Sequence, residues 1–251
     1  TIRWSYELLD EQEQQVFNRL AVFQGYWDLD AAGALCGDIA GDVMDSILSL
    51  VDKSMVQQRE MPNGEIMFVL LETLREFARE RLIASGEEAA IAARHADYYL
   101  AVAESHSEEH SDDAYLAWAF IVEATFDNFR TAFQWFLGNG QAEKAARLFL
   151  GLTEFWHMRG VPGEHVYWRD ILLPYMGTLQ PYLKAAVLNL AGHFYRDYGN
   201  LDAARQFFTE ALVLSGDSAE GRKLYYITLN NLAITHALAR EFEVASRLYE
   251  E

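Results

Sequence analysis

The 251-residue sequence contains one cysteine, Cys36, and only four prolines. A single cysteine excludes an internal disulfide and is typical of a reducing compartment, so we expect a cytoplasmic location. Because prolines and alternating strand-like patterns are both scarce, the sequence predicts a mostly α-helical chain. No apolar run approaches the roughly 18 residues of a membrane-spanning helix, and the N-terminus lacks a signal-peptide pattern. We therefore expect no membrane partner.

Residues 1–86 predict a winged-helix module. The expected elements are three helices, a β-hairpin and a closing helix, over residues 10–23, 28–37, 42–54, 54–70 and 70–86. Asp10 and Glu13 have the spacing of a capping box at the start of the first helix. Asn63 and Gly64 are expected at the hairpin turn because both residue types tolerate a positive φ. This order of elements is typical of a winged helix.

Residues 87–251 predict helix pairs, and two stretches within them repeat 41 residues apart. The matched positions are Gly192 with Ala233, Tyr195 with His236, Ala204 with Ala245, and Phe208 with Tyr249. A weaker copy has equivalent residues at Thr153, Trp156, His165 and Trp168. Such small and large positions are typical of a tetratricopeptide repeat, in which small residues let antiparallel helices approach closely. We therefore expect a right-handed α-superhelix after the winged helix.

The sequence starts at Thr1 rather than at a methionine, and it stops at Glu251 within a helical pattern. We therefore expect a piece of a longer protein, with an exposed apolar face after the last helix pair. In that case the function of the whole protein also depends on parts outside these residues.

Several stretches together resemble a known family. Residues 1–37 and 50–82 are similar to the start and end of the winged-helix module that follows the nucleotide-binding domain in bacterial STAND (NB-ARC-like) ATPases. "RHADYYLAVAE" (94–104) and "FDNFRTAFQWFLGNGQAEKAARL" (126–148) resemble the helical region that leads into the tetratricopeptide sensor of that family. LuxR-type and antibiotic-regulatory-type transcriptional regulators have a similar architecture.

The resemblance implies a signal-transducing parent ATPase that binds ATP or ADP in an upstream P-loop domain. No G-x-x-x-x-G-K-[ST] motif occurs in this sequence, so we expect these residues to bind no cofactor and to hydrolyse no ATP. The resemblance also implies that the winged helix packs on the nucleotide-binding domain in cis. The repeats would then receive a protein or a small-molecule inducer.

Positive charge is scarce where DNA recognition would need it. The chain has 20 Lys and Arg against 38 Asp and Glu, and residues 1–86 have 7 against 15. The helix expected to enter a DNA groove, residues 42–52, has no cation and three acids: Asp42, Asp45 and Asp52. The wing has Arg59 beside Glu60. Because such a surface repels phosphates, the sequence favours a protein-packing role over direct contact with nucleic acid.

One short motif has the spacing of metal ligands. "HSEEH", from His106 to His110, matches the pattern H-x-x-E-H, in which two histidines lie one helical turn apart. No third ligand in a catalytic setting follows, and the stretch is acidic. We therefore interpret it as a solvated helix end and predict no metal site and no catalytic residue. Cys36 has no activating neighbour and is expected to be a small core residue.

The concave surface of the repeats is the strongest candidate for recognition. In tetratricopeptide arrays the first helix of each pair lines this surface, and the register predicts which side chains face it. They are Glu154, His157, Met158, Asn189, His193, Arg196 and Asn230. Polar side chains on a helix of otherwise small residues suit the binding of a peptide or a small ligand.

The resulting hypothesis is a non-catalytic regulatory and sensor part of a signal-transducing ATPase or transcriptional regulator. A ligand or protein would bind the repeats and change how the winged helix packs on the nucleotide-binding domain. The alternative is a transcriptional regulator that binds DNA through this winged helix.

Overall fold

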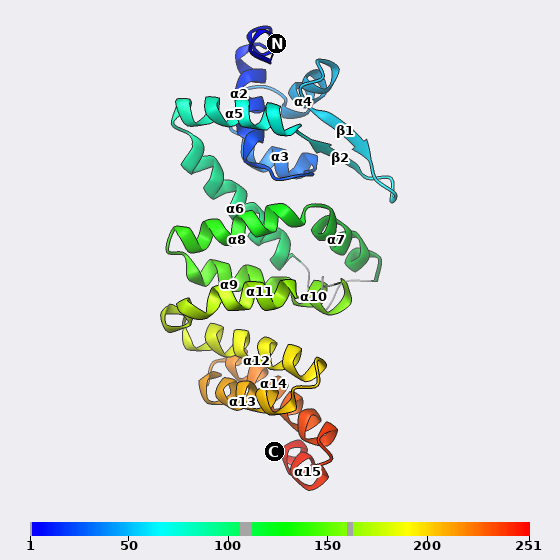
Figure 1. Ribbon diagram of the computed structural model, residues 1–251, viewed down its shortest axis with the longest axis vertical. Helices are drawn as coiled ribbons and strands as arrows, with labels where there is room; N and C mark the ends of the chain where they lie inside the picture. Colours follow the sequence, from blue (N-terminus) through cyan, green and yellow to red (C-terminus); the bar gives the residue numbers. More distant parts are fainter. Residues whose placement is uncertain (1, 106–111, 160–162) are drawn as a thin grey trace. The chain divides into compact units, whose positions relative to one another are not determined.

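The computed structural model describes residues 2–105, 112–159 and 163–251. The chain groups into two compact units, residues 1–139 and 140–251 (Figure 1). Helices dominate both units, and the strands found in the described residues form one two-stranded sheet in the first unit. The predicted fold class, mostly α with one β-hairpin, is confirmed. None of the described helices combines the length and the apolar character that crossing a bilayer requires.

The first part of unit 1 forms the predicted winged helix. Its elements are α1 (Ile2–Glu7), α2 (Glu11–Arg19), η1 (Leu20–Val22), α3 (Leu29–Cys36), α4 (Val43–Asp52), β1 (Gln57–Glu60), β2 (Ile66–Val69) and α5 (Glu72–Ser85). The capping box is present: the Glu13 amide donates to Asp10 Oδ1 at 2.8 Å, and the Asp10 amide donates to Glu13 Oε2 at 2.9 Å. Gly64 in the hairpin turn has a φ of 86°, as the turn prediction requires. Local sequence signals thus predicted the local structure well.

The wing is anchored by the segment between η1 and α3. β1 pairs antiparallel with β2, with Gln57 opposite Val69. Trp27 adds an isolated backbone bridge to Phe68, with N···O distances of 3.0 and 2.8 Å. The Trp27 indole is fully buried and stacks on the rings of Phe23 and Phe68, with centroid distances of 5.3 and 5.0 Å. This aromatic stack holds the hairpin against the helices.

Three more helices belong to unit 1: α6 (Glu88–Glu104), α7 (Asp112–Ala124) and α8 (Phe126–Gly138). Helix α6 packs against α3, α5 and α8. This grouping places α6 to α8 with the winged helix, whereas the sequence placed residues 87–139 with the repeats; the domain boundary between residues 86 and 87 stays a prediction. The physical reason is a set of partly buried polar contacts, described below, that join α6 and α8 to the winged helix.

Unit 2 consists of helices that pair as in a tetratricopeptide repeat. They are α9 (Ala142–Gly151), α10 (Thr153–Arg159), α11 (Glu164–Leu172), η2 (Leu173–Thr178), α12 (Pro181–Asp197), α13 (Leu201–Leu214), α14 (Ala219–Leu238) and α15 (Phe242–Glu250). Helix α12 packs on α13, α13 on α14, and α14 on α15. In the weaker copy, the rings of Trp156 and Trp168 meet edge to face with centroids 5.4 Å apart. The predicted helix pairs are therefore present.

Gly192 allows α12 and α13 to approach closely. A Cβ atom at this glycine would lie 2.7 Å from Phe208 Cε1, which is closer than van der Waals contact. Phe208 is fully buried and packs with Ala204 and Leu232, so its ring has little room to move. The equivalent position in the next pair is Ala233, which is also buried. The small and large positions predicted from the repeat thus meet in the first of the two pairs.

Gly192→Ala is expected to lower the free energy of unfolding of unit 2 by about 2 kcal/mol, because the added methyl overpacks the contact with Phe208. Urea unfolding followed by circular dichroism would measure the loss. Gly177→Ala is the matched control, since a Cβ at that glycine meets nothing within 4 Å. Equal stability of the two variants would contradict the packing argument.

Candidate functional site

Helix α4, which would enter a DNA groove if this winged helix bound DNA, exposes apolar and acidic side chains. Met44 and Leu48 are 50% and 39% exposed, and Asp45 and Asp52 lie on the same exposed surface. No residue of α4 carries a positive charge. This face therefore combines apolar area with negative charge.

Lys53, the cation that follows α4, is engaged with Glu13 of α2. Its Nζ lies 2.5 Å from Glu13 Oε1, which also accepts a hydrogen bond from the Ser49 hydroxyl at 2.5 Å. Burial alone would raise the pKa of Glu13, but the hydrogen bonds from Lys53 and Ser49 outweigh it, and the pKa lies below its ordinary value. The lysine charge nearest α4 is therefore neutralised within the domain.

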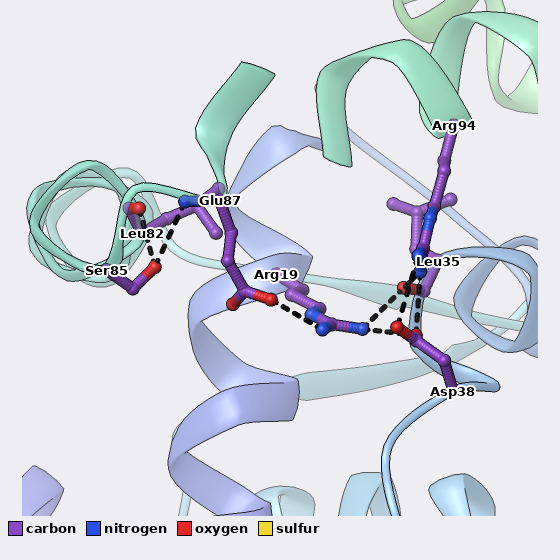
Figure 2. A network of polar contacts seen from close by, with 7 residues as sticks. All are labelled: Arg19, Leu35, Asp38, Leu82, Ser85, Glu87 and Arg94. Carbon is purple, nitrogen blue, oxygen red and sulfur yellow. Dashed lines mark hydrogen bonds and ion pairs between the residues drawn. The ribbon is translucent and has the colours of Figure 1, made fainter. Parts of the chain in front are cut away.

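A polar network joins the winged helix to α6 (Figure 2). The guanidinium of Arg19, on α2, is buried between two carboxylates: Nη1 lies 2.5 Å from Asp38 Oδ1, and Nη2 lies 2.6 Å from Glu87 Oε1. Arg94 of α6 also binds Asp38, at 2.7 and 3.1 Å. Hydrogen bonds from Arg94 and Arg19 hold the pKa of Asp38 well below its usual range. The network therefore connects α2, the turn after α3 and the N-terminal part of α6, where Glu87 immediately precedes the helix and Arg94 lies within it.

A second set of polar contacts joins the winged helix to α8. Asn128 of α8 is fully buried, and its Oδ1 accepts from the Gln24 amide at 2.7 Å. Its Nδ2 donates to the carbonyl oxygens of Gln24 and Tyr26 at 2.8 and 2.9 Å. His95 Nε2 lies 3.0 Å from Asn128 Oδ1, and burial lowers the pKa of His95 to about 4. The side-chain amide of Asn128 thus forms hydrogen bonds with three backbone groups of the loop that precedes Trp27.

A hollow of about 300 Å³ lies where the winged helix meets α6 and α8, a region that we call the joint. Its lining combines charged, aromatic and small side chains from η1, α5, α6 and α8, among them Arg75, Arg79, Glu88, His95 and Trp135. Arg79 and Glu88 form an ion pair across α5 and α6 at 3.1 Å. The joint between the winged helix and the following helices therefore has room for a small molecule.

In unit 2, the structure brings four of the predicted groove residues into one row. His157 of α10 approaches His193 of α12, with 3.1 Å between His157 Nε2 and His193 Nδ1. Arg196 Nη2 lies 2.6 Å from His193 Nε2. The row reaches α14 through Asn231, whose Oδ1 accepts from Arg196 Nη1 at 3.0 Å and whose Nδ2 donates to Asn189 Oδ1 at 3.2 Å. We call His157, His193, Arg196, Asn189 and Asn231 the inner polar row.

The remaining predicted groove residues lie outside this row. Glu154 and Met158 are exposed on α10, and Met158 is 67% exposed. Asn230 is exposed on α14, and its neighbour Asn231 makes the contacts instead. Binding of a ligand by the predicted set stays a prediction.

Asp197 is a site residue that the sequence reasoning missed. Its Oδ2 lies 3.3 Å from His193 Nδ1, and the two residues are one helical turn apart on α12. Burial, with the nearby Arg196 cation, lowers the pKa of His193 to about 4. The four-residue spacing of His193 and Asp197 was visible in the sequence, but the partner on α10 was not.

The sequence also singled out one cysteine, Cys36, and one histidine motif. Cys36 is fully buried, and burial raises the pKa of its thiol to about 12, as expected for a core residue. The motif from His106 to His110 lies outside the described residues.

Comparison with known proteins supports the winged helix. Residues 9–83 match the family model for a winged helix-turn-helix domain. A protein of Mycobacterium tuberculosis (strain H37Rv) named as an HTH-type transcriptional regulator is 38% identical over 176 residues, covering 69% of this chain and 20% of that protein. A Mycobacterium bovis protein with the same kind of name matches to the same extent. The chain thus spans about a fifth of the length of these relatives.

Two further similarities are weaker. An uncharacterized protein of Mycobacterium tuberculosis is 39% identical over 99 residues, covering 38% of this chain and 25% of that protein. The crystal structure of a STAND protein with a tetratricopeptide repeat sensor from Pyrococcus horikoshii superposes with a TM-score of 0.36 and 16% identity, over 98% of this chain and 50% of that chain.

Proposed function

We propose that the winged helix-turn-helix domain of residues 9–83 is a protein-packing module of a transcriptional regulator, and that unit 2 senses an inducer. The names of the mycobacterial relatives support a regulator. The helix pairs of unit 2 and their inner polar row support a binding role for that unit, because polar side chains gathered on paired helices suit a peptide or a small ligand. This part of the regulator carries no catalytic role in the proposal.

The face of α4 is the observation that carries the packing role. It exposes Met44 and Leu48 beside Asp45 and Asp52, while Lys53 is paired with Glu13. DNA binding depends on cations that neutralise phosphates, and an acidic face repels them. Covering exposed apolar side chains with another protein surface instead lowers the free energy of the system. The proposed neighbour is a nucleotide-binding domain of the same protein, which would hold ATP or ADP.

The joint supports transmission of a signal through unit 1. Arg19 ties α2 to the start of α6, and Asn128 ties α8 to the loop before Trp27. Buried and hydrogen-bonded contacts of this kind make neighbouring helices move together. In the proposal, a change in α6 or α8 therefore changes the position of the α4 face.

The DNA alternative is tested by fluorescence anisotropy with a mixed-sequence duplex at low salt. We expect no binding up to roughly 100 µM protein, the weak end of ordinary non-specific affinity. Salt-sensitive binding that is lost in Arg59→Ala would overturn the packing role and establish DNA recognition through the wing.

A charge-matched pair of variants checks the role of the α4 face. Asp45→Lys with Asp52→Lys should produce weak, salt-sensitive DNA binding, because the two changes place cations where phosphates would lie. Glu220→Lys with Glu243→Lys changes the net charge equally at exposed positions in unit 2. An equal gain in both double variants would show that net charge, and not the α4 face, prevents binding.

A further inference from the structure

We propose that His157, His193 and Asp197 bind a divalent transition-metal ion such as Zn²⁺ at the inner polar row. A metal ion would be the class of ligand that unit 2 senses. This sensing role rests on the proposed function. The site itself rests on geometry alone. The donor atoms of these three side chains all lie within 4.8 Å of one another.

Two of the three separations between donor atoms fit a single ion, and the atoms of the third pair, on His157 and Asp197, lie within 4.8 Å of each other. His193 Nδ1 lies 3.1 Å from His157 Nε2 and 3.3 Å from Asp197 Oδ2. Ligand atoms at ~2.0–2.1 Å from a tetrahedral Zn²⁺ are about 3.3–3.4 Å apart, so an ion between these atoms requires small side-chain movements. Imidazole and carboxylate are also donors that first-row divalent metals prefer.

The three ligands come from two helices of unit 2. His193 and Asp197 are one turn apart on the same face of α12. His157 comes from α10, and its ring packs beside His193 with centroids 4.4 Å apart. His157 and Asp197 are exposed, so an ion can reach the site from solvent. Three protein ligands leave further coordination positions for water or for a second ligand.

Arg196 couples the proposed site to the next helix pair. Its Nη2 lies 2.6 Å from His193 Nε2, and its Nη1 donates to Asn231 on α14 at 3.0 Å. When His193 Nδ1 coordinates a metal, the neutral ring carries its proton on Nε2. Two N–H donors would then face each other, and the metal and the guanidinium also repel. The Arg196 side chain must therefore leave His193, which changes the link between α12 and α14.

The experiment uses the whole 251-residue chain, stripped of metal with a chelator. Co²⁺ is titrated and followed by visible absorption, and Zn²⁺ is titrated by isothermal calorimetry. We expect one ion per chain. His193→Ala and Asp197→Asn should each weaken binding by about 100-fold or more, because each removes a ligand, and loss of outer-shell partners alone costs about 10–100-fold. Arg196→Gln should tighten binding about tenfold, because it removes a nearby positive charge.

His236→Ala is the matched control. Its Nδ1 lies 2.5 Å from a single carboxylate, that of Glu241, outside the proposed cluster. This variant should bind the metal as the wild type does. Circular dichroism of every variant checks that the helices remain folded.

Several results would overturn the metal site. One is the absence of stoichiometric binding in both the wild type and Arg196→Gln. Another is binding that persists in His193→Ala. Binding that is lost in His106→Ala with His110→Ala, and kept in His193→Ala, would place the ion at the sequence motif instead. Each of these leaves the packing role of the winged helix standing, because that role is tested separately with DNA.

Discussion

Asn128→Ala is expected to lower the free energy of unfolding of unit 1 by about 3 kcal/mol. Asn128 is fully buried, and its amide satisfies the Gln24 amide and the carbonyl oxygens of Gln24 and Tyr26, besides contacting His95. Each buried polar group left without a partner costs about 1–3 kcal/mol, and the partial exposure of Gln24 and Tyr26 lets water replace some of the lost bonds. Urea unfolding measures the loss.

The matched control for this variant is Asn139→Ala. Asn139 is exposed directly after α8, and its side-chain amide donates to the Trp135 carbonyl oxygen of that helix at 2.8 Å. Its loss is expected to stay below about 0.5 kcal/mol. Hydrogen exchange at the Gln24 amide provides a local readout, since Asn128→Ala should remove its protection while Asn139→Ala should not. Unchanged protection in both variants would show that the contact with α8 does not hold this loop.

Trp27→Ala is expected to destabilise the winged helix by about 4 kcal/mol, within the range for removing a large aromatic side chain from a core. The indole is fully buried and stacks on both Phe23 and Phe68, so its removal leaves a cavity that neither ring can fill. Near-ultraviolet circular dichroism and urea unfolding both report the loss. Trp4→Ala is the control in the same unit, because Trp4 is 66% exposed. A small effect of Trp27→Ala, similar to that of Trp4→Ala, would contradict a role for the stack.

Short-range features of the fold were predictable because their causes lie within a few residues. The capping box of Asp10 and Glu13 and the turn at Gly64 depend on side-chain chemistry and backbone freedom at neighbouring positions. The backbone bridge between Trp27 and Phe68 is different, because it joins segments that are distant in sequence. No periodicity near Trp27 indicates this partner.

The inner polar row was predictable in part. The 41-residue repeat indicated the face of α12 that holds Asn189, His193 and Arg196, because residues at equivalent positions of repeated helices face the same surface. It indicated Asn230 on α14, whereas Asn231 makes the contacts. A shift of one residue turns a side chain about 100° around a helix, which is finer than a repeat alignment can resolve.

The proposed metal ligands also show what a sequence pattern cannot indicate. A search for neighbouring histidines finds His106 and His110, which are close in sequence. His157 and His193 are 36 residues apart and belong to different helices, so only the packing of α10 on α12 brings their nitrogen atoms together. The spacing of His193 and Asp197 was present in the sequence, but two ligands on one helix do not define a site.

The contact between Asn128 and Gln24 also affects when the protein can fold during its synthesis. The two residues are 104 positions apart. Ribosomes add about 5–20 residues per second, so Gln24 leaves the ribosome roughly 5–20 s before Asn128. During that time the loop before Trp27 lacks the amide that will satisfy its backbone. The winged helix, although it precedes α8 in the sequence, therefore reaches its final structure only after α8 has been synthesised.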